Sequence, residues 1–308
     1  MGRTQELRTI YVVIPSYGDN KSVLEITSEI DAMVDRNLVF CILDDSAGVD
    51  EYPKLASNFH IFIPKSNMGQ QKILVNFFRH TLPIYFNHTP NDLVLILDGD
   101  GEDAPININK MLMLLEANNA EMVVATRGKR QVKALFKIGY LIFQIFGFIL
   151  CNRKINHGTY SVSRRKSLEK AVKNRNFDYS FVGGMIANKM TKEKLKCDRD
   201  PRRFGKSNLN KINLISYGLR VYAGINPKVS YKLYQITSAL IVVFTLTSLD
   251  ESFAVRNYQF SSFLTGILYF YLILNACYLP ILLFLKRSHR LLSPEKFLVV
   301  NHATVPRT

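Results

Sequence analysis

The stretch LVLILDGDGEDAP, residues 93–105, joins a short apolar run to a strongly acidic exit. The run Leu93 to Leu97 predicts a buried strand of a parallel sheet. Asp98, Asp100 and Glu102 alternate along the exit, so their oxygens are expected to converge. Convergent hard oxygens suit Mg²⁺ or Mn²⁺. The stretch therefore predicts a site for one of these cations at the carboxyl end of a strand.

Four other short apolar runs are separated by stretches with helical potential: Thr9–Ile14, Val39–Leu43, Phe59–Ile63 and Met122–Ala125. This alternation predicts an α/β fold with a mainly parallel, Rossmann-like sheet and helices on both faces. Ligands of such sheets lie beyond the carboxyl ends of the strands. Six polar side chains fall there, namely Tyr17, Asp19, Asp44, Asp45, Asp98 and Asp100.

The composition bounds the class of protein and of partner. The chain has 308 residues and 47% hydrophobic content, enough for a sizeable core and a second region. Its net charge of +15 favours anionic partners, but no nucleic-acid-binding motif accompanies the charge and Trp is absent, so we expect no nucleic acid partner. The four cysteines lack paired spacing, which argues against a disulfide framework or a cysteine metal cluster.

Two charge-free stretches near the C-terminus, Leu233–Leu249 and Asn257–Leu285, predict membrane-spanning helices at about 231–249 and 262–285. The alternative is a buried helical hairpin of a soluble protein. Basic residues flank the pair, which places both ends in the cytoplasm. The N-terminus lacks the apolar stretch of a signal peptide. We therefore expect a multi-pass protein of the cell (inner or cytoplasmic) membrane with a cytoplasmic catalytic domain.

The domain prediction is a catalytic domain at 1–228 and a membrane anchor with a basic cytoplasmic tail at 229–308. A further apolar segment at 132–151 follows the basic run RGKRQVK and is free of charge only from Ile138 to Cys151. It is too short to span a bilayer comfortably, so it is expected to form either an interfacial helix or a core helix.

Several motifs resemble those of family 2 glycosyltransferases with the GT-A fold, in the polyprenyl-phosphate (dolichol-phosphate mannose synthase-like) branch. The resemblance covers nearly the whole chain, including the two trailing membrane helices, and rests on VVIPSYGDN at 12–20, LDDSAG at 43–48, NMGQQK at 67–72, DGDGEDAP at 98–105, ATRGKR at 125–130 and RRFGKSN at 202–208. It implies a GT-A domain followed by a two-helix transmembrane hairpin.

The resemblance also implies roles for individual residues. The catalytic residues are Asp98 and Asp100, and the metal ligands are Asp98, Asp100 and Glu102. The nucleotide-sugar is expected to contact Pro15, Tyr17, Asp19, Asp44, Asp45, Asp98, Arg202 and Ser207. Asn67 and Gly69 match the family's N-x-G element. Arg127 and Lys129, with Arg130, are expected to hold the acceptor phosphate, and Lys206 to assist at the donor phosphates.

The implied activity is an inverting, metal-dependent transfer of a sugar from a UDP- or GDP-sugar to a polyprenyl phosphate for cell-envelope or glycan assembly, and the D-D-x-S element favours UDP. NHGTYSVSRR at 156–165 departs from the family pattern and is interpreted as an altered acceptor loop. Transfer to a hydroxyl of a lipid-linked oligosaccharide therefore stays open, with Asp178 or His157 as base. A catalytically silent nucleotide-sugar-binding scaffold is the other alternative, and a homo-oligomer is open.

Each motif also has a structural interpretation. Asp19 can cap the following helix, and Asp45 with Ser46 can initiate a turn. DGDGED can form a calcium loop, and Asp44, Asp45 and Asp98 together can form the phospho-acceptor site of a receiver domain. Arg127 can contact lipid headgroups, and RRFGKS can be a solvated basic loop.

Overall fold

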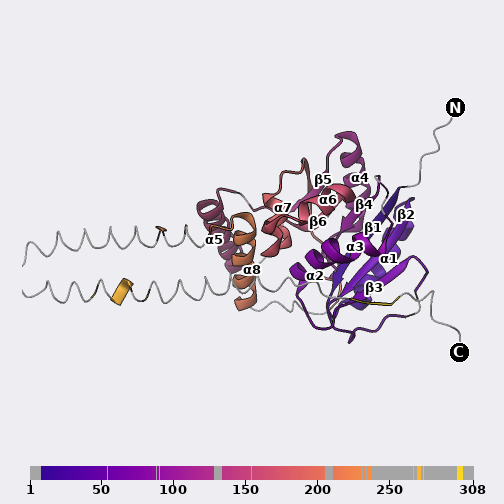
Figure 1. Ribbon diagram of the computed structural model, residues 1–308, viewed down its shortest axis with the longest axis horizontal. Coiled ribbons are helices and arrows are strands. Elements are labelled where there is room, and N and C mark those ends of the chain that lie inside the picture. The colour runs from indigo at the N-terminus through magenta and orange to yellow at the C-terminus, as the bar shows by residue number, and fades with distance from the viewer. Residues whose placement is uncertain are drawn as a thin grey trace, which may run out of the picture.

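The computed structural model describes residues 8–53, 55–87, 89, 91–127, 134–153, 155–204, 211–229 and 297–300, with a few single residues between 232 and 273. Its described strands form one eight-stranded sheet in the order β7-β5-β6-β4-β1-β2-β3-β8. Figure 1 shows this sheet with helices packed around it and a pair of helices, α5 and α8, to its left.

The five strands predicted from the sequence are confirmed. They are β1 (Thr9–Ser16), β2 (Asn37–Asp44), β3 (Phe59–Ile63), β4 (Leu93–Ile96) and β5 (Met122–Arg127). Strands β4, β1, β2 and β3 lie next to one another and run parallel, with Val13 paired to Cys41 on one side and to Ile96 on the other. Their carboxyl ends therefore share one rim of the sheet, as the sequence predicts.

Three strands were not predicted: β6 (His157–Arg164), β7 (Lys192–Cys197) and β8 (Leu298–Val300). Because β6 runs antiparallel to both β4 and β5, and β8 antiparallel to β3, the sheet is mixed, with four parallel and three antiparallel pairings among its described strands. The interpretation of 156–165 as a loop is wrong for residues 157–164, which form β6. Tyr160 and Val162 of β6 are buried in the core, and Ser161 and Ser163 are fully buried between its neighbours.

Helices cover both faces of the sheet, as predicted. One face is covered by α1 (Asn20–Met33) and α4 (Ile108–Ala117), which follows the short 3-10 helix η2 (Pro105–Asn107). The other face is covered by a continuous helical stretch and by two later helices, with a 3-10 turn between them: α2 (Gln70–Asn76), the π-helix η1 (Phe77–Thr81), α3 (Leu82–Tyr85), α6 (Arg165–Val172), η3 (Arg175–Asp178) and α7 (Phe181–Ala187).

Side chains of β1 show how one strand serves both layers. Ile10, Val12 and Ile14 enter the core beneath α1 and α4, whereas Tyr11 and Val13 enter the opposite core beneath α2 and α7. Successive side chains of a strand point to opposite faces, so a strand covered on both sides reads as a continuous apolar run.

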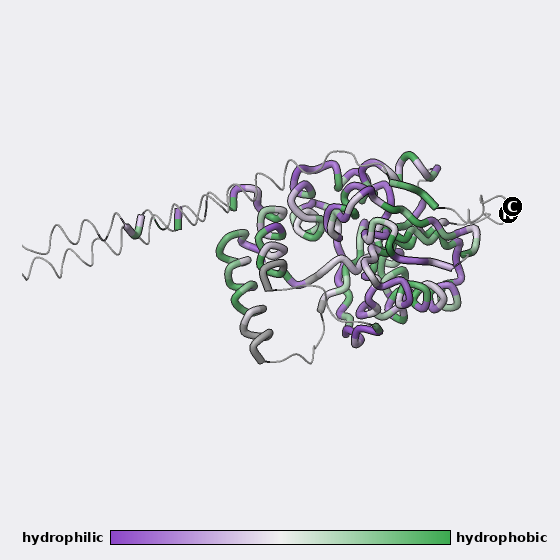
Figure 2. The backbone as a smooth tube through the Cα atoms, turned by 90° about the horizontal axis from the view of Figure 1, so that it is seen from below, coloured by the Kyte–Doolittle hydropathy of each residue, from purple (hydrophilic) through white to green (hydrophobic). Residues whose placement is uncertain are grey.

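The segment predicted at 132–151 forms α5 (Ala134–Cys151), which packs against α8 (Lys211–Ile225). The rings of Phe143 and Tyr222 stack at 5.0 Å, and the Tyr222 hydroxyl donates to the Phe143 carbonyl at 2.6 Å. The opposite side of α5 is apolar and exposed, and its described part is coloured as hydrophobic in Figure 2.

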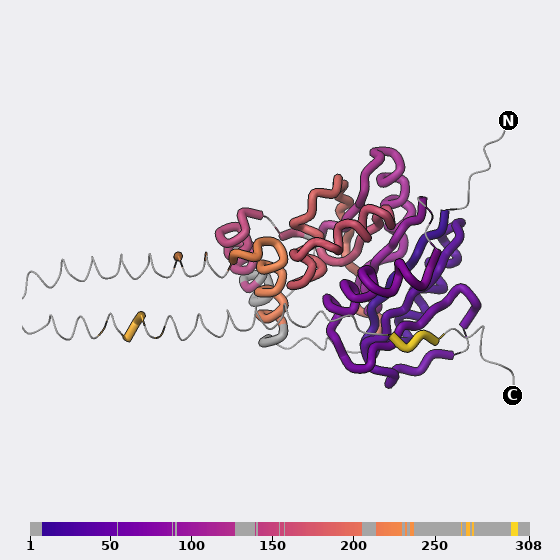
Figure 3. The backbone as a smooth tube through the Cα atoms, in the orientation of Figure 1, coloured from indigo at the N-terminus to yellow at the C-terminus, as the bar shows by residue number. Residues whose placement is uncertain are grey.

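No helix among the described residues is both long and apolar enough to cross a membrane. The predicted spans at about 231–249 and 262–285 lie outside the described residues, apart from single residues. Beyond them β8 returns to the sheet, where Leu298 pairs with Ile63 at the edge of β3. Figure 3 shows this C-terminal strand, in yellow, beside the N-terminal half of the chain.

Candidate active site

The rim formed by the ends of β1, β2 and β4 gathers the acidic side chains predicted from the sequence. Pro15 is buried at the end of β1, and Tyr17 just beyond it is 50% exposed on the rim. The Asp45 N–H donates to the Ser16 carbonyl at 2.9 Å, which ties the end of β2 to the end of β1. The polar residues that follow these strands are thereby held close together.

Asp44 and Asp45 follow one another at the end of β2 but have different surroundings. Asp45 accepts the N–H groups of Met68 and Gly69 at 2.7 Å each, so its carboxylate fixes the turn that leads into α2. Asp44 is fully buried, and its Oδ1 accepts the Ser46 N–H at 2.9 Å. Its Oδ2 has no hydrogen-bond partner among the described residues, and burial raises the pKa of this carboxyl.

The structural interpretations of Asp19, Asp45 and Ser46 can be compared with their local contacts. Ser46 does initiate a turn, because its hydroxyl accepts the N–H groups of Val49 and Asp50. Asp45 instead makes long-range contacts. Asp19 stands at the N-cap position of α1, yet its side chain makes no capping hydrogen bond.

Asp19 is instead paired with Arg202 across the rim. Nη2 of Arg202 donates to both Asp19 oxygens, at 2.6 and 2.9 Å, and Nη1 lies 3.6 Å from Asp100 Oδ2. Charge-assisted hydrogen bonds of this kind are shorter and stronger than those between neutral groups. The arginine of the RRFGKS motif therefore lies at the acidic rim and is not a freely solvated residue.

Asp98 is held by neighbours from three different parts of the chain. Its Oδ1 accepts hydrogen bonds from Gln70 Nε2 at 2.6 Å and Thr159 Oγ1 at 2.7 Å, and its Oδ2 lies 3.3 Å from Arg199 Nη2. Gln70 begins α2 and Thr159 lies on β6. The carboxylate at the end of β4 is thus oriented by both flanking elements.

The loop that follows β4, residues 98–103, is called the acidic loop below. Asp100 Oδ1 accepts the Glu102 N–H at 3.0 Å, which tightens the turn. Burial, and then the charge of Asp98, raise the pKa of Asp100 to about 6. Asp103 is 3% exposed, its Oδ2 accepts the Asp98 N–H, and burial raises its pKa as well.

Arg199, which follows β7, lies over this loop. It donates to Glu102 Oε2 at 2.8 Å and to Asp103 Oδ1 at 3.0 Å, besides its contact with Asp98. Burial opposes its charge, but the facing carboxylates outweigh that effect, so its pKa is raised. One guanidinium group thus bridges three carboxylates of the acidic loop.

The predicted metal ligands were tested against this geometry. Within the part of the chain that the structure describes, no three His, Cys, Asp or Glu side chains are arranged to hold a metal ion. The reason is local: Arg199 bridges Asp98 and Glu102, while Arg202 approaches Asp100. The convergence of three oxygens expected from their alternation is not present in this arrangement.

The chemistry of the donor set nevertheless fits a divalent cation. Among the described residues of the rim, the guanidinium groups of Arg199 and Arg202 face five carboxylates, those of Asp19, Asp98, Asp100, Glu102 and Asp103. The pKa values of Asp100 and Asp103 are raised by burial first, and the neighbouring carboxylates add to that rise. Asp98, Asp100 and Glu102 are the residues that would hold Mg²⁺ or Mn²⁺.

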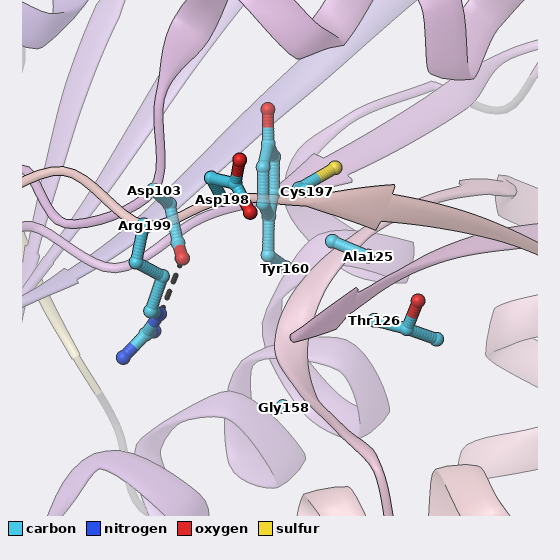
Figure 4. Close-up of a pocket in the computed structure, with 8 residues that line it drawn as sticks. All are labelled: Asp103, Ala125, Thr126, Gly158, Tyr160, Cys197, Asp198 and Arg199. Carbon is cyan, nitrogen blue, oxygen red and sulfur yellow. Dashed lines mark hydrogen bonds and ion pairs between the residues drawn. The ribbon is translucent and has the colours of Figure 1, made fainter. Parts of the chain in front are cut away.

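A small pocket adjoins Arg199 between the ends of β5, β6 and β7. It has a volume of about 20 Å³ and is lined by Asp103, Ala125, Thr126, Gly158, Tyr160, Cys197, Asp198 and Arg199. Figure 4 shows the Asp103 carboxylate pointing to the Arg199 guanidinium, with the Tyr160 ring beside them. A volume of this size holds a water molecule but not a sugar.

Other predicted residues are placed only in part or not at all. Lys129, Arg130, Lys206 and Ser207 lie outside the described residues. Arg127 ends β5 and His157 begins β6, but their side chains are not described. Asn67 donates to the Asp45 carbonyl at 3.0 Å. Asp178 pairs with Arg79 at 2.6 Å, so this candidate base joins η3 to η1.

Four residues of the site escaped the sequence interpretation: Gln70, Asp103, Thr159 and Arg199. The alternation of Thr159, Ser161 and Ser163 with apolar residues was a usable signal for a strand. Arg199 gives no local signal, because its partner Glu102 lies 97 residues earlier.

Comparison with known proteins shows that the chain matches the model of one protein family. Residues 11–172, more than half of the chain, match the model described as Glycosyl transferase family 2. No curated protein matches the chain. The matched residues run from β1 to the end of α6 and include Asp19, Asp44, Asp98 and Asp100.

Three solved structures are similar at low TM-scores. Glucosyl-3-phosphoglycerate synthase from Mycobacterium tuberculosis, in complex with Mn²⁺, UDP and glucosyl-3-phosphoglycerate, is 15% identical with a TM-score of 0.42, over 72% of this chain and 80% of that one. S. aureus TarS in complex with UDP-GlcNAc is 13% identical with a TM-score of 0.44, over 73% and 66%. A mycobacterial protein is 15% identical with a TM-score of 0.47, over 72% and 75%.

Proposed function

This chain belongs to glycosyl transferase family 2 and is a glycosyltransferase, and from that premise we propose that it moves a sugar from a nucleotide diphosphate-sugar to a polyprenyl phosphate at a membrane surface. The observation that carries the proposal is the single rim where the ends of β1, β2 and β4 gather acidic side chains opposite two arginines.

The donor's base is proposed to contact Asp44. This carboxylate is buried at the end of β2 and keeps one oxygen without a partner among the described residues. A buried acceptor left unpaired costs free energy, so a ligand that donates a hydrogen bond there binds favourably. Uracil and guanine both carry a ring N–H that can donate to a carboxylate. Asp44 therefore supports a UDP- or GDP-sugar, without choosing between them.

The diphosphate is proposed to lie between Arg202 and the acidic loop. Arg202 already reaches from Asp19 to Asp100, and a guanidinium group binds phosphate oxygens in the same two-pronged way as a carboxylate. A divalent cation held by Asp98 and Asp100 supplies positive charge against the leaving diphosphate. Gln70 and Thr159 keep Asp98 oriented for that role.

The acceptor is proposed to approach along the exposed apolar side of α5 and α8. Large apolar side chains there are at least 49% exposed: Leu141, Ile142, Ile145, Phe146, Phe148, Ile149 and Ile215. An apolar helix face of this kind is suited to the boundary between lipid headgroups and acyl chains. The chain beyond α8 leads into the charge-free stretches expected to span the membrane, which supports a lipid as the surface that α5 meets.

A phosphate acceptor also agrees with the surroundings of Asp178, the described candidate for a general base. A lipid phosphate is already anionic near neutral pH, so attack on the sugar needs orientation of the nucleophile more than removal of a proton. The Asp178 carboxylate is engaged with Arg79, which leaves it poorly suited to act as a base. Arg127, at the end of β5 on the same side of the sheet, is the proposed ligand of the acceptor phosphate.

The test is transfer of radiolabel from a panel of UDP- and GDP-sugars into organic-extractable lipid. Membranes containing the full chain are assayed with Mn²⁺ or with EDTA, and the Asp100→Ala variant serves as the inactive control. Asp35→Asn, which changes an exposed carboxylate after α1, serves as the matched control for charge. We expect label that is labile to mild acid, requires the cation and is lost only in Asp100→Ala.

The other outcomes each count against a named part of the proposal. Lipid-extractable label that resists mild acid contradicts the phosphate acceptor and favours a hydroxyl of a lipid-linked oligosaccharide. Binding of a nucleotide sugar without any product contradicts catalysis and favours a scaffold. Sugar transfer that persists in EDTA contradicts the requirement for a divalent cation.

A further inference from the structure

The segment after β7, residues 199–204, is called the basic segment, and it is tied to the acidic loop by its backbone. The Asp200 N–H donates to the Glu102 carbonyl at 3.0 Å, and the Arg203 N–H donates to the Asp100 carbonyl at 3.2 Å. The two stretches therefore run side by side. A movement of the basic segment is therefore expected to shift the acidic loop, and a movement of the loop to shift the segment.

Side-chain contacts of Arg199 reinforce this pairing. Residues 103 and 199 form an antiparallel bridge, and the guanidinium group reaches Glu102 at 2.8 Å, Asp103 at 3.0 Å and Asp98 at 3.3 Å. The Arg199 side chain is only 20% exposed. Pairs shielded in this way are screened less by water and salt than pairs on an open surface.

The oxygens that Arg199 binds overlap with those proposed for the cation. Asp98 Oδ2 and Glu102 Oε2 each contact a nitrogen of Arg199. A divalent cation binds carboxylate oxygens at about 2.0–2.6 Å and repels a guanidinium group held against the same atoms. A cation bound at Asp98 Oδ2 and Glu102 Oε2 therefore competes with Arg199 for these two oxygens.

We propose that Arg199 is a positioning residue that occupies the cation-binding oxygens of Asp98 and Glu102, so that a divalent cation binds only by displacing it. This inference rests on the proposed function, because it takes the acidic loop as the cation site. Displacement loosens the basic segment, which carries Arg202, at the moment when the donor's phosphates need that arginine. Cation binding and presentation of the phosphate-binding arginine are thereby coupled.

Displacement of Arg199 has a second local consequence. Arg199 forms one wall of the small pocket that also contains Asp103 and Tyr160 (Figure 4). Movement of that wall is expected to change the size of this pocket.

The test is titration of Mn²⁺ into the full-length protein in detergent, without donor, by isothermal titration calorimetry. We expect Arg199→Gln to bind Mn²⁺ about tenfold more tightly than the wild type, because hydrogen bonds to charged partners of this kind are each worth roughly that factor. Arg199→Lys keeps a cation beside Asp103 and is expected to be intermediate. It also decides the matter if the Gln variant does not fold.

Arg203→Gln is the matched control. It removes the same charge from the same segment, but Arg203 pairs with Glu29 and Glu25 on α1 instead of with the cation-binding oxygens. We expect its affinity for Mn²⁺ to equal that of the wild type. A gain as large as that of Arg199→Gln overturns the proposal, because it shows a general effect of charge.

A fluorescence reporter measures the displacement itself. The chain contains no Trp, and Phe204 of the basic segment is 41% exposed, so Phe204→Trp adds a single reporter. We expect Mn²⁺ to shift its emission in the otherwise wild-type protein. In the Arg199→Gln background the emission is expected to lie close to the shifted value before Mn²⁺ is added.

The outcomes separate this inference from the proposed function. If Arg199→Gln and the wild type bind Mn²⁺ equally and Asp98→Asn abolishes binding, the cation site stands and the role of Arg199 is refuted. If none of the proteins binds Mn²⁺ and sugar transfer persists in EDTA, the proposed cation site is refuted, and this inference is refuted with it.

Discussion

Asp44→Asn tests the nucleotide-binding end of the site with the least structural disturbance. Asn keeps the oxygen that accepts the Ser46 N–H and replaces only the second oxygen, which has no partner among the described residues. An amide N–H then faces the ring N–H of the donor's base. The hydrogen bond is lost, because two hydrogen-bond donors then face each other.

The magnitude follows from the burial of this group. A hydrogen bond to a charged acceptor is worth roughly 1.5–3 kcal/mol, so we expect the donor KM to rise about 10- to 100-fold while kcat changes little. The substitution should not lower the free energy of unfolding, although it weakens donor binding. Asp44 is fully buried and its pKa is raised by burial, so removal of its charge is expected to leave the free energy of unfolding unchanged or higher.

The assay measures initial rates over a range of donor concentrations, with calorimetric binding of the nucleoside diphosphate and thermal unfolding of the free protein. Asp35→Asn is the surface control. Because the raised pKa brings protonation of Asp44 to higher pH, donor affinity of the wild type should weaken as pH falls, and that of Asp44→Asn should not. An unchanged donor KM in the variant refutes the reasoning, as does a KM effect accompanied by lost stability.

Three shorter predictions concern the other half of the site. Thr159→Val removes one of the hydrogen bonds that orient Asp98, and kcat is expected to fall about fivefold, the equivalent of ~1 kcal/mol, in steady-state assays. Gly101→Ala should lower the free energy of unfolding by about 1–2 kcal/mol in denaturant titrations, because φ is +82°, whereas Gly158→Ala, with open space around its added Cβ, should not. Affinity for Mn²⁺, measured by calorimetry, should decline below about pH 6 as Asp100 takes up a proton, since cation and proton compete for the carboxylate.

The strands and the rim could be predicted from the sequence because their signals are local. Leu93 to Leu97 is a continuous apolar run followed directly by Asp98. The same pattern, an apolar run followed by an aspartate, marks the end of β2 at Asp44. Parallel pairing then places these ends together, whatever the details of packing. The candidate residues named at those ends therefore lie on one rim of the sheet, and their functional roles stay predictions.

The remainder depended on contacts between distant residues. Strand β7, KEKLKC, is polar at an edge of the sheet, and no apolar run marks it. Glu102 was expected to converge with Asp98 and Asp100, but its carboxylate instead faces Arg199. A pattern of carboxylates predicts where a positive charge is needed, and it does not say whether a metal ion or an arginine meets that need.

Strand β8 has a consequence for how the protein is made. β3 is completed by residue 63, but the strand that covers its open edge leaves the ribosome only after residue 300 has been synthesised. Until then the nascent chain carries an exposed sheet edge, which is a template for pairing with other chains. Pairing of β8 with β3 is therefore a late step, and it covers this edge of the sheet.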